Sequence, residues 1–278
     1  MKKINRRSFL VAAGLTAAAL ALTACGGSAS STASSTASSA ASSEAASTSA
    51  AAELTTVEAG KLTMATNATF PPYEMTTDSG EIEGIDVDTA KAIAEKLGLE
   101  LQIDDMDFDA ALLSVQQGKA DIVMAGVTVT DERKAVMDFS DSYATGIQSI
   151  IVPEGSDITS PDDLAGKKIG TQRGTTGYIY CSDDFGDDAV VAYDDGLTAV
   201  QALKNGQVDA VVIDNAPAKE YVAANPGLVI LDTSYAEEDY AIGMAKGSAL
   251  EDAVNAALEE LKADGTLQSI VDKYITAE

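Results

Sequence analysis

The sequence contains no histidine and no tryptophan, and only two of its 278 residues are cysteine. Without histidine, the chain lacks the general base of Ser-His-Asp and Cys-His nucleophiles. It also lacks the commonest zinc ligand, and two cysteines alone do not make a zinc site. These absences remove the most frequent catalytic machinery without excluding catalysis. We expect no metal site and no cofactor, and we do not expect an enzyme.

Positive charge is also scarce. The chain has 18 lysines and arginines against 44 aspartates and glutamates, which gives a formal net charge of −26. Such a balance disfavours nucleic acid and anionic membrane surfaces as partners, because both repel an acidic protein. It weakly favours cationic small molecules.

The N-terminus has the three parts of an export signal. Four basic residues lie among the first seven, an apolar segment covers residues 9–22, and Leu22-Thr23-Ala24-Cys25 follows. Residues 1–24 therefore read as a signal peptide that is too short to be a spanning helix. Leu-Thr-Ala-Cys resembles a bacterial lipobox, which implies cleavage before Cys25 and lipidation of its sulfur. Arg6-Arg7-Ser8-Phe9-Leu10 also resembles a twin-arginine signal, so the export route stays open.

Cleavage would leave a mature chain with a net charge of −30 and one free thiol, that of Cys181. Residues 26–52 are almost entirely serine, alanine and threonine, a composition that buries nothing and predicts a flexible tether. Twenty-seven such residues span roughly 30 Å. We therefore expect residues 25–59 to form a lipidated tether on the outer face of the bacterial cytoplasmic membrane, with Cys25 as the only membrane contact.

From about residue 60, short apolar runs alternate with helical periodicity. The expected strands are residues 61–66, 99–103, 120–125, 167–171, 189–192 and 208–213, and the expected helices are residues 87–97, 109–117, 175–181 and 197–205. This alternation is typical of parallel α/β sheets flanked by helices. Residues 118–124 (GKADIVM) and 206–212 (GQVDAVV) echo each other, which predicts two similar lobes. Open α/β sheets bind ligands outside the carboxyl ends of their strands, so a crevice between the lobes is expected.

The end of the chain predicts a return to the first lobe. Ser248 and Glu251 have the spacing of a capping box that opens a helix ending at Ala263, and residues 266–275 make a last helix. We assign residues 60–143 and 241–278 to lobe 1 and residues 147–237 to lobe 2. The two connections, at residues 143–146 and 238–241, would form a two-strand hinge.

Residues 124–133 (MAGVTVTDER) are the most informative stretch. A buried strand ends at Gly126, Thr130 has the position of a helix N-cap, and Arg133 lies one turn into the helix. Free backbone N–H groups beside a guanidinium suit a carboxylate, which arginine binds through two parallel hydrogen bonds. The alternative is that Arg133 only solvates the helix face and pairs with Asp131 or Glu132.

Several short motifs occur in a characteristic order. They are residues 67–74 (NATFPPYE), 84–88 (GIDVD), 106–108 (MDF), 125–133, 138–140 (DFS), 174–177 (GTTG), 209–214 (DAVVID) and 264–266 (DGT). In this order and at these spacings, residues 60–278 resemble the extracellular solute-binding proteins of ABC importers, family 3, in the group for polar amino acids. The resemblance implies a two-lobed periplasmic-binding-protein-like fold that closes on a free amino acid. It also implies an ABC permease as partner. The sequence leaves the oligomeric state open, and a monomer is the default expectation.

The resemblance further implies a set of ligand contacts. Arg133 would hold the α-carboxylate with the backbone N–H groups of Thr128 and of Thr175 or Thr176. The α-ammonium would go to Asp214, with oxygens of Gly126 and Thr128. Phe70 and Phe108 would enclose the side chain, and Asn67 and Gln172 would tune its choice.

Each assignment has a structural alternative. Asp214 could merely start a turn, Phe70 and Phe108 could belong to the core, and Glu74 and Asp86 are interpreted as structural. Asn67 stands where many relatives carry an acid, which weakens an ion pair to a basic ligand. The two phenylalanines can still attract a cation through their rings. Basic amino acids such as arginine or lysine are therefore favoured narrowly over glutamine or another neutral polar amino acid.

Two other classes of function are compatible with the fold. Some proteins of similar fold dehydrate small carboxylate-bearing rings, and here Asp214 or Glu74 would have to supply the acid without a visible activating partner. A surface adhesin or sensor could use the same crevice for attachment or signalling. A turnover assay distinguishes the enzyme from the transport protein.

Overall fold

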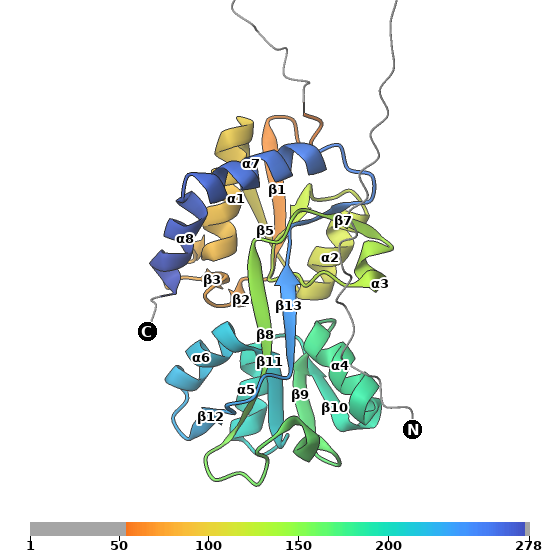
Figure 1. Cartoon of the computed structure of the whole chain (residues 1–278), viewed down its shortest axis with the longest axis vertical. Helices are drawn as coiled ribbons and strands as arrows, with labels where there is room; N and C mark the ends of the chain where they lie inside the picture. Colours follow the sequence, from red (N-terminus) through yellow and green to blue (C-terminus); the bar gives the residue numbers. More distant parts are fainter. Residues whose placement is uncertain (1–53, 276–278) are drawn as a thin grey trace, which may run out of the picture. The chain divides into compact units, whose positions relative to one another are not determined.

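The computed structural model describes residues 54–275, drawn in colour in Figure 1. The predicted signal peptide, Cys25 and most of the predicted tether lie outside the described residues. Within residues 54–275, no helix has the length and apolar character needed to cross a membrane.

One five-stranded sheet has the order β5-β1-β6-β14-β7. Its strands are β5 (Glu100–Asp105), β1 (Lys61–Thr66), β6 (Ile122–Val123), β14 (Gly243–Ala245) and β7 (Met137–Phe139). β1 runs parallel to β5 and β6, whereas β14 runs antiparallel to β6 and β7. We call the part built on this sheet the first lobe.

Helices and a small sheet complete the first lobe. The helices are α1 (Ile85–Leu97), α2 (Phe108–Gln116), α3 (Asp131–Lys134), α7 (Glu251–Ala263) and α8 (Thr266–Tyr274). The small sheet contains β2 (Thr69–Phe70), β3 (Glu74–Thr76) and β4 (Ile82–Glu83). α1 buries Val87, Ala90, Ile93 and Ala94 at helical spacing, and Gly98 ends it with a left-handed φ of 71°.

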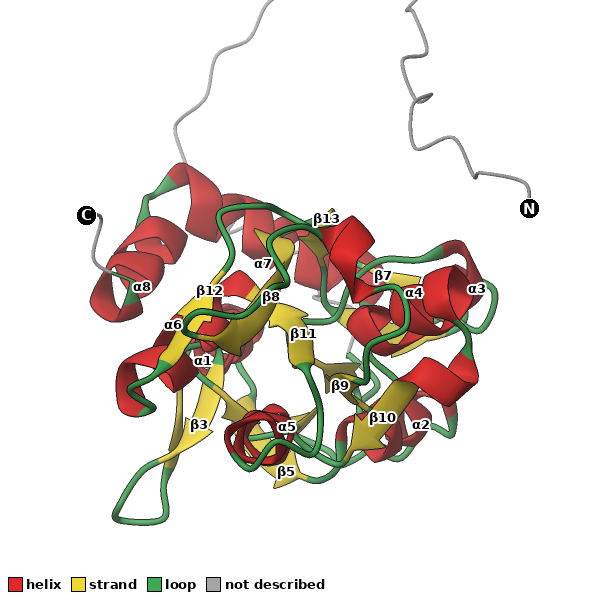
Figure 2. Cartoon of the chain, turned by 90° about the horizontal axis from the view of Figure 1, so that it is seen from below, coloured by secondary structure: helices red, strands yellow, loops and turns green. Residues whose placement is uncertain are grey.

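The second lobe is built on a six-stranded sheet with the order β10-β9-β11-β8-β12, in which β13 also pairs with β8. Its strands are β10 (Val190–Tyr193), β9 (Ile169–Gln172), β11 (Ala210–Asp214), β8 (Ala144–Pro153), β12 (Leu228–Ile230) and β13 (Ala236–Tyr240). The helices α4 (Thr176–Phe185), α5 (Gly196–Lys204) and α6 (Asn215–Ala224) lie around this sheet (Figure 2). Two short 3₁₀ helices, η1 (Pro161–Leu164) and η2 (Asp187–Ala189), lie in its connections.

β8 and β13 form the connection between the lobes. They pair antiparallel from Gln148 opposite Ala236 to Ala144 opposite Tyr240, and Figure 1 shows the pair running from one lobe into the other. The first sheet takes its strands from residues 61–139 and 243–245, and the second from residues 144–240. The residue limits given to the lobes stay a prediction.

One predicted helix start is wrong, whereas the predicted start of the folded part lies close to the first contacts. Leu54 packs against the core, and the backbone N–H of Val57 donates to Asp121 Oδ1 at 2.7 Å. The capping box at Ser248 does not form, and α7 begins at Glu251. The Ser248 hydroxyl instead accepts from the backbone N–H of Leu250, a local turn that competes with a helix cap.

Candidate functional site

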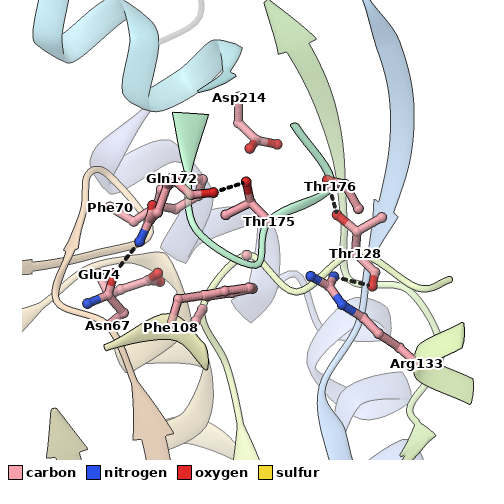
Figure 3. Close-up of a pocket in the computed structure, with 12 residues that line it drawn as sticks. Asn67, Phe70, Glu74, Phe108, Thr128, Arg133, Gln172, Thr175, Thr176 and Asp214 are labelled. Atoms are coloured by element: carbon pink, nitrogen blue, oxygen red, sulfur yellow. Dashed lines mark hydrogen bonds between the residues drawn. The ribbon is translucent and has the colours of Figure 1, made fainter. Parts of the chain in front are cut away.

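The loops at the carboxyl ends of the strands in both lobes surround one pocket (Figure 3). Its lining residues come from both lobes, and they include all ten residues predicted from the sequence: Asn67, Phe70, Phe108, Gly126, Thr128, Arg133, Gln172, Thr175, Thr176 and Asp214. Glu74 and Ala125 line it as well. The sequence therefore located the pocket, while the role of each residue in binding stays a prediction.

The loop after β6 brings backbone and guanidinium to the same wall. Gly126 has a left-handed φ of 56°, and a Cβ there would lie 2.7 Å from the Phe70 ring, so glycine is needed for both conformation and space. The Thr130 hydroxyl accepts from the backbone N–H of Arg133 at 3.1 Å, which makes Thr130 the N-cap of α3 as predicted.

Arg133 turns into the pocket. Its Nη1 donates to the carbonyl oxygen of Thr128 at 2.8 Å, and its Nη2 donates across the lobes to the carbonyl oxygen of Gly174 at 3.1 Å. The guanidinium carbon lies 5.4 Å from the centre of the Phe108 ring, within cation–π range. Only 8% of the residue is exposed, so the alternative of a solvated helix face is wrong. Burial lowers the pKa of Arg133, and the nearby carboxylate of Glu238 is the largest opposing effect.

Asp214 ends β11 on the second lobe. Its Oδ1 accepts a hydrogen bond from the Tyr240 hydroxyl, and its Oδ2 accepts one from Gln148 Nε2 at 2.8 Å. The carboxylate does not cap α6, which argues against a role in starting a turn. Burial, and then the charge of Glu238, raises the pKa of Asp214 to about 7. The pocket thus holds a buried cation on one lobe and a buried acid on the other.

Asn67, Gln172, Thr175 and Thr176 also line the pocket. Gln172 Nε2 donates across the lobes to Asn67 Oδ1 at 2.9 Å, and Asn67 in turn donates to the carbonyl oxygen of Met106. The Thr175 hydroxyl accepts from the backbone N–H of Tyr178 and so caps α4. Thr176 begins that helix, where unpaired N–H groups favour an anion.

Glu74 lines the pocket although the sequence favours a structural role for it and names it otherwise only as a possible acid of the dehydratase alternative. It follows the Phe-Pro-Pro-Tyr stretch, and its side chain reaches the pocket wall (Figure 3). The residue is fully buried, and among the described residues its carboxyl oxygens receive no hydrogen bond from a protein donor. Burial, and then the neighbouring Asp86, raises the pKa of Glu74 well above its usual value. No local pattern in the sequence predicts that Glu74 lines the pocket, because its position depends on how β3 packs beside β2.

Two α/β lobes joined by two strands, with charged groups of opposite sign around one pocket between them, define a two-lobed solute-binding protein. Residues 62–277 match the model of the bacterial extracellular solute-binding proteins, family 3, and the chain belongs to this family. The predicted family and the predicted two-lobed α/β fold are thereby confirmed.

Known relatives are similar over most of their length. The chain is 33% identical over 283 residues to the arginine-binding extracellular protein ArtP of Bacillus subtilis, covering 97% of both chains. It is 35% identical, with a TM-score of 0.75, to the arginine-, lysine-, histidine-binding protein ArtJ of Geobacillus stearothermophilus, covering 78% of this chain and 96% of that one. An ancestral arginine-binding protein bound to glutamine is 44% identical, with a TM-score of 0.75, over 78% of this chain and 99% of that one.

Proposed function

We propose that the protein binds a free amino acid between its lobes and delivers it to the permease of an ABC importer. The observation that carries this proposal is the pair of buried charges, Arg133 on the first lobe and Asp214 on the second, which both line one pocket. A zwitterionic α-carbon group supplies the complementary charges. A buried charge is costly unless it is paired, so this pocket favours a ligand that carries both groups.

Each predicted residue has a role in this proposal. Arg133 holds the α-carboxylate together with backbone N–H groups of Thr128 and of Thr175 or Thr176. Asp214 receives the α-ammonium, with oxygens of Gly126 and Thr128. The ligand side chain then lies between Phe70 and Phe108, near Asn67 and Gln172, and capture occurs by hinge closure at β8 and β13.

A basic side chain is the first choice of ligand. Asp214, Glu238 and Glu74 place three acids around the pocket, whereas Arg133 is the only basic residue that lines it within residues 54–275. A second positive charge on the ligand favours the ionised form of these acids and pairs with it, and the Phe70 and Phe108 rings favour a cation. The names of ArtP and ArtJ, which report arginine, lysine and histidine as ligands of those proteins, support the same choice.

Glutamine is the second candidate. The hydrogen bond between the amides of Asn67 and Gln172 places neutral donors and acceptors from both lobes at the pocket. A neutral amide side chain could exchange hydrogen bonds with both groups. The ancestral arginine-binding protein solved with glutamine supports this candidate.

The proposal also covers the cell context. We infer cleavage before Cys25, lipidation of that cysteine, and a monomeric chain held at the outer face of the cytoplasmic membrane by this anchor alone. The family comprises solute-binding proteins, which favours transport over the dehydratase and the adhesin or sensor.

Calorimetry on the mature chain tests the proposal. Residues 25–278 with Cys25→Ser would be unfolded and refolded to remove carried-over ligand, and then titrated with the twenty amino acids. Binding of arginine, lysine or histidine supports a basic ligand, and binding of glutamine alone supports the second candidate. If no amino acid binds and a carboxylate-bearing ring compound is turned over, the proposal is wrong.

Glu74→Gln identifies the group that selects a basic side chain. We expect this variant to bind arginine about tenfold more weakly while its affinity for glutamine stays unchanged. A guanidinium beside Glu74 favours the ionised form of this acid, whose pKa is raised in the free protein, and a glutamine at this position keeps the shape but cannot ionise. Glu83→Gln on exposed β4 makes the same charge change away from the pocket and is the matched control. Equal losses for arginine and glutamine would assign Glu74 a structural role instead.

A further inference from the structure

Glu238 is a buried carboxylate on the hinge strand β13, and only 5% of the residue is exposed. It does not line the pocket, and no motif in the sequence singles it out. Three donors nevertheless converge on its Oε2 atom. They are the hydroxyls of Thr128 and Thr176, at 3.1 and 3.0 Å, and Nε2 of Gln148, at 3.0 Å.

The three donors come from different parts of the molecule. Thr128 lies in the loop after β6 on the first lobe, Thr176 begins α4 on the second lobe, and Gln148 lies on the other hinge strand, β8. Thr128 and Thr176 both line the pocket, and Figure 3 shows their side chains facing each other. Glu238 therefore lies behind the pocket and contacts the side chains that form its wall.

The direction of these hydrogen bonds fixes what the wall offers to a ligand. A carboxylate only accepts, so both threonine hydroxyls direct their hydrogen atoms toward Glu238. Their oxygens then present lone pairs to the pocket. Gln148 uses the same amide nitrogen to donate to Glu238 and to Asp214, and Tyr240 donates to the other oxygen of Asp214. The side chains of Thr128, Thr176 and Asp214 consequently present acceptors to a ligand at this end of the pocket.

We propose that Glu238 is a positioning residue that makes the protein selective for ligands with an α-ammonium group. It acts through Thr128, Thr176 and Gln148, by taking their hydrogen atoms and leaving their oxygens, with Asp214, to accept from the three N–H donors of an ammonium. The inference rests on the proposed amino-acid ligand and assigns the selection of its amino group to a residue outside the pocket.

Replacement by glutamine tests the direction of the hydrogen bonds. A glutamine at position 238 keeps the size of the side chain but carries an NH₂ group, which donates. Whichever way its amide turns, it removes the negative charge that attracts both hydroxyl hydrogens. When its NH₂ group faces the threonines, at least one hydroxyl accepts from it and turns its own hydrogen toward the pocket, where it opposes an ammonium. The matched control is Glu237→Gln, which changes the charge equally on the exposed face of the same strand.

The probes are L-arginine and 5-guanidinopentanoic acid, which is arginine without its α-amino group. Titration calorimetry on the mature chain gives the ratio of two dissociation constants, that of the analogue divided by that of L-arginine. We expect Glu238→Gln to weaken L-arginine by about tenfold or more and to leave the analogue unchanged, so that the ratio falls by the same factor. Glu237→Gln should keep the ratio of the unmodified chain. L-glutamine and glutaramic acid replace this pair if the unmodified chain binds glutamine and not arginine.

Two results would overturn the inference while leaving the proposed function intact. One is an unchanged ratio in Glu238→Gln, and the other is an equal loss for both probes, which indicates a structural role. Failure of the unmodified chain to bind any amino acid overturns the proposed function itself. Thr176→Val, which removes one hydroxyl, should also lower the ratio. Thr176→Ser, which keeps the hydroxyl, should have the ratio of the unmodified chain.

Discussion

At the residue scale, the guanidinium of Arg133 joins main-chain oxygens of both lobes. We expect Arg133→Ala to weaken amino-acid binding by about a hundredfold, or about 3 kcal/mol, because a charged pair of hydrogen bonds to the α-carboxylate is lost. Calorimetry measures the loss, and circular dichroism verifies the fold. Arg133→Lys is the control, since it keeps the charge and loses the two parallel hydrogen bonds. Its affinity should lie between that of the unmodified chain and that of Arg133→Ala. Unchanged affinity in Arg133→Ala would show that the carboxylate binds elsewhere.

The acid on the other lobe makes binding depend on pH. The pKa of Asp214 is raised to about 7 by its burial, whereas an ammonium ligand requires the ionised carboxylate. Binding must therefore release a proton below pH 7. We expect the affinity to be greatest above pH 7 and to fall by up to about tenfold for each unit below it. The same measurement on the Glu74→Gln variant is the control, because it removes the other acid at the pocket wall whose pKa is raised. An affinity that stays constant between pH 5.5 and 8 would contradict the prediction.

The same pKa shift acts on the stability of the ligand-free protein. The folded-state pKa of Asp214 lies above its ordinary value of 3.8, so its stabilising contribution is full below pH 3.8 and is lost as the pH rises through about 7. Asp214→Asn should therefore raise the free energy of unfolding, relative to the unmodified chain, more at pH 8 than at pH 4. The increase at pH 8 should exceed the increase at pH 4 by on the order of 1 to 4 kcal/mol. Urea unfolding at the two pH values measures this difference. An equal effect at both would show that Asp214 keeps an ordinary pKa.

At the element scale, the hinge strands hold the acid end of the pocket. A Cβ on Gly146 of β8 would lie 2.4 Å from the ring of Tyr240, which is fully buried and donates to Asp214. Gly146→Ala must displace that ring, so we expect a loss of about 1 to 3 kcal/mol in the free energy of unfolding together with weaker ligand binding. Thr145→Ala, on the exposed face of the same strand, should change neither. Unaltered binding in Gly146→Ala would show that Tyr240 does not position Asp214.

The sequence predicted the elements whose signals are local. Periodicity located α1, Gly98 marked its end, and the spacing from Gly126 through Thr130 to Arg133 predicted the loop, the cap and the reach of the guanidinium. The pairing of β8 with β13 joins residues about 90 positions apart, so a hinge there was predicted from the return of the chain to the first lobe, while no local pattern encodes its register. The place of Glu74 at the pocket and the contacts of Glu238 could not be predicted for the same reason, because their surroundings exist only after distant strands have packed. Ser248 misled because a two-residue turn competes with the cap.

At the scale of the whole molecule, the lobes touch through contacts outside the pocket. The Tyr221 hydroxyl on α6 of the second lobe donates to the carbonyl oxygen of Thr69 on β2 of the first. Neither residue lines the pocket, so the contact bears on closure and not on ligand choice. A ligand that binds only the closed form has its affinity reduced by the fraction of molecules that are open.

Tyr221→Phe removes this contact and should therefore shift the protein toward the open form. The loss of one buried hydrogen bond is worth about 1 kcal/mol, so we expect every amino acid that binds to be weakened by the same factor of about five. The matched control is Tyr235→Phe, whose hydroxyl donates to Asp184 within the second lobe, and which should lower stability without changing affinity. Calorimetry with two different ligands, and small-angle scattering with and without ligand, measure affinity and closure together. If Tyr221→Phe changed the ratio of the two affinities, the contact would be part of ligand selection, and closure would not be separable from specificity.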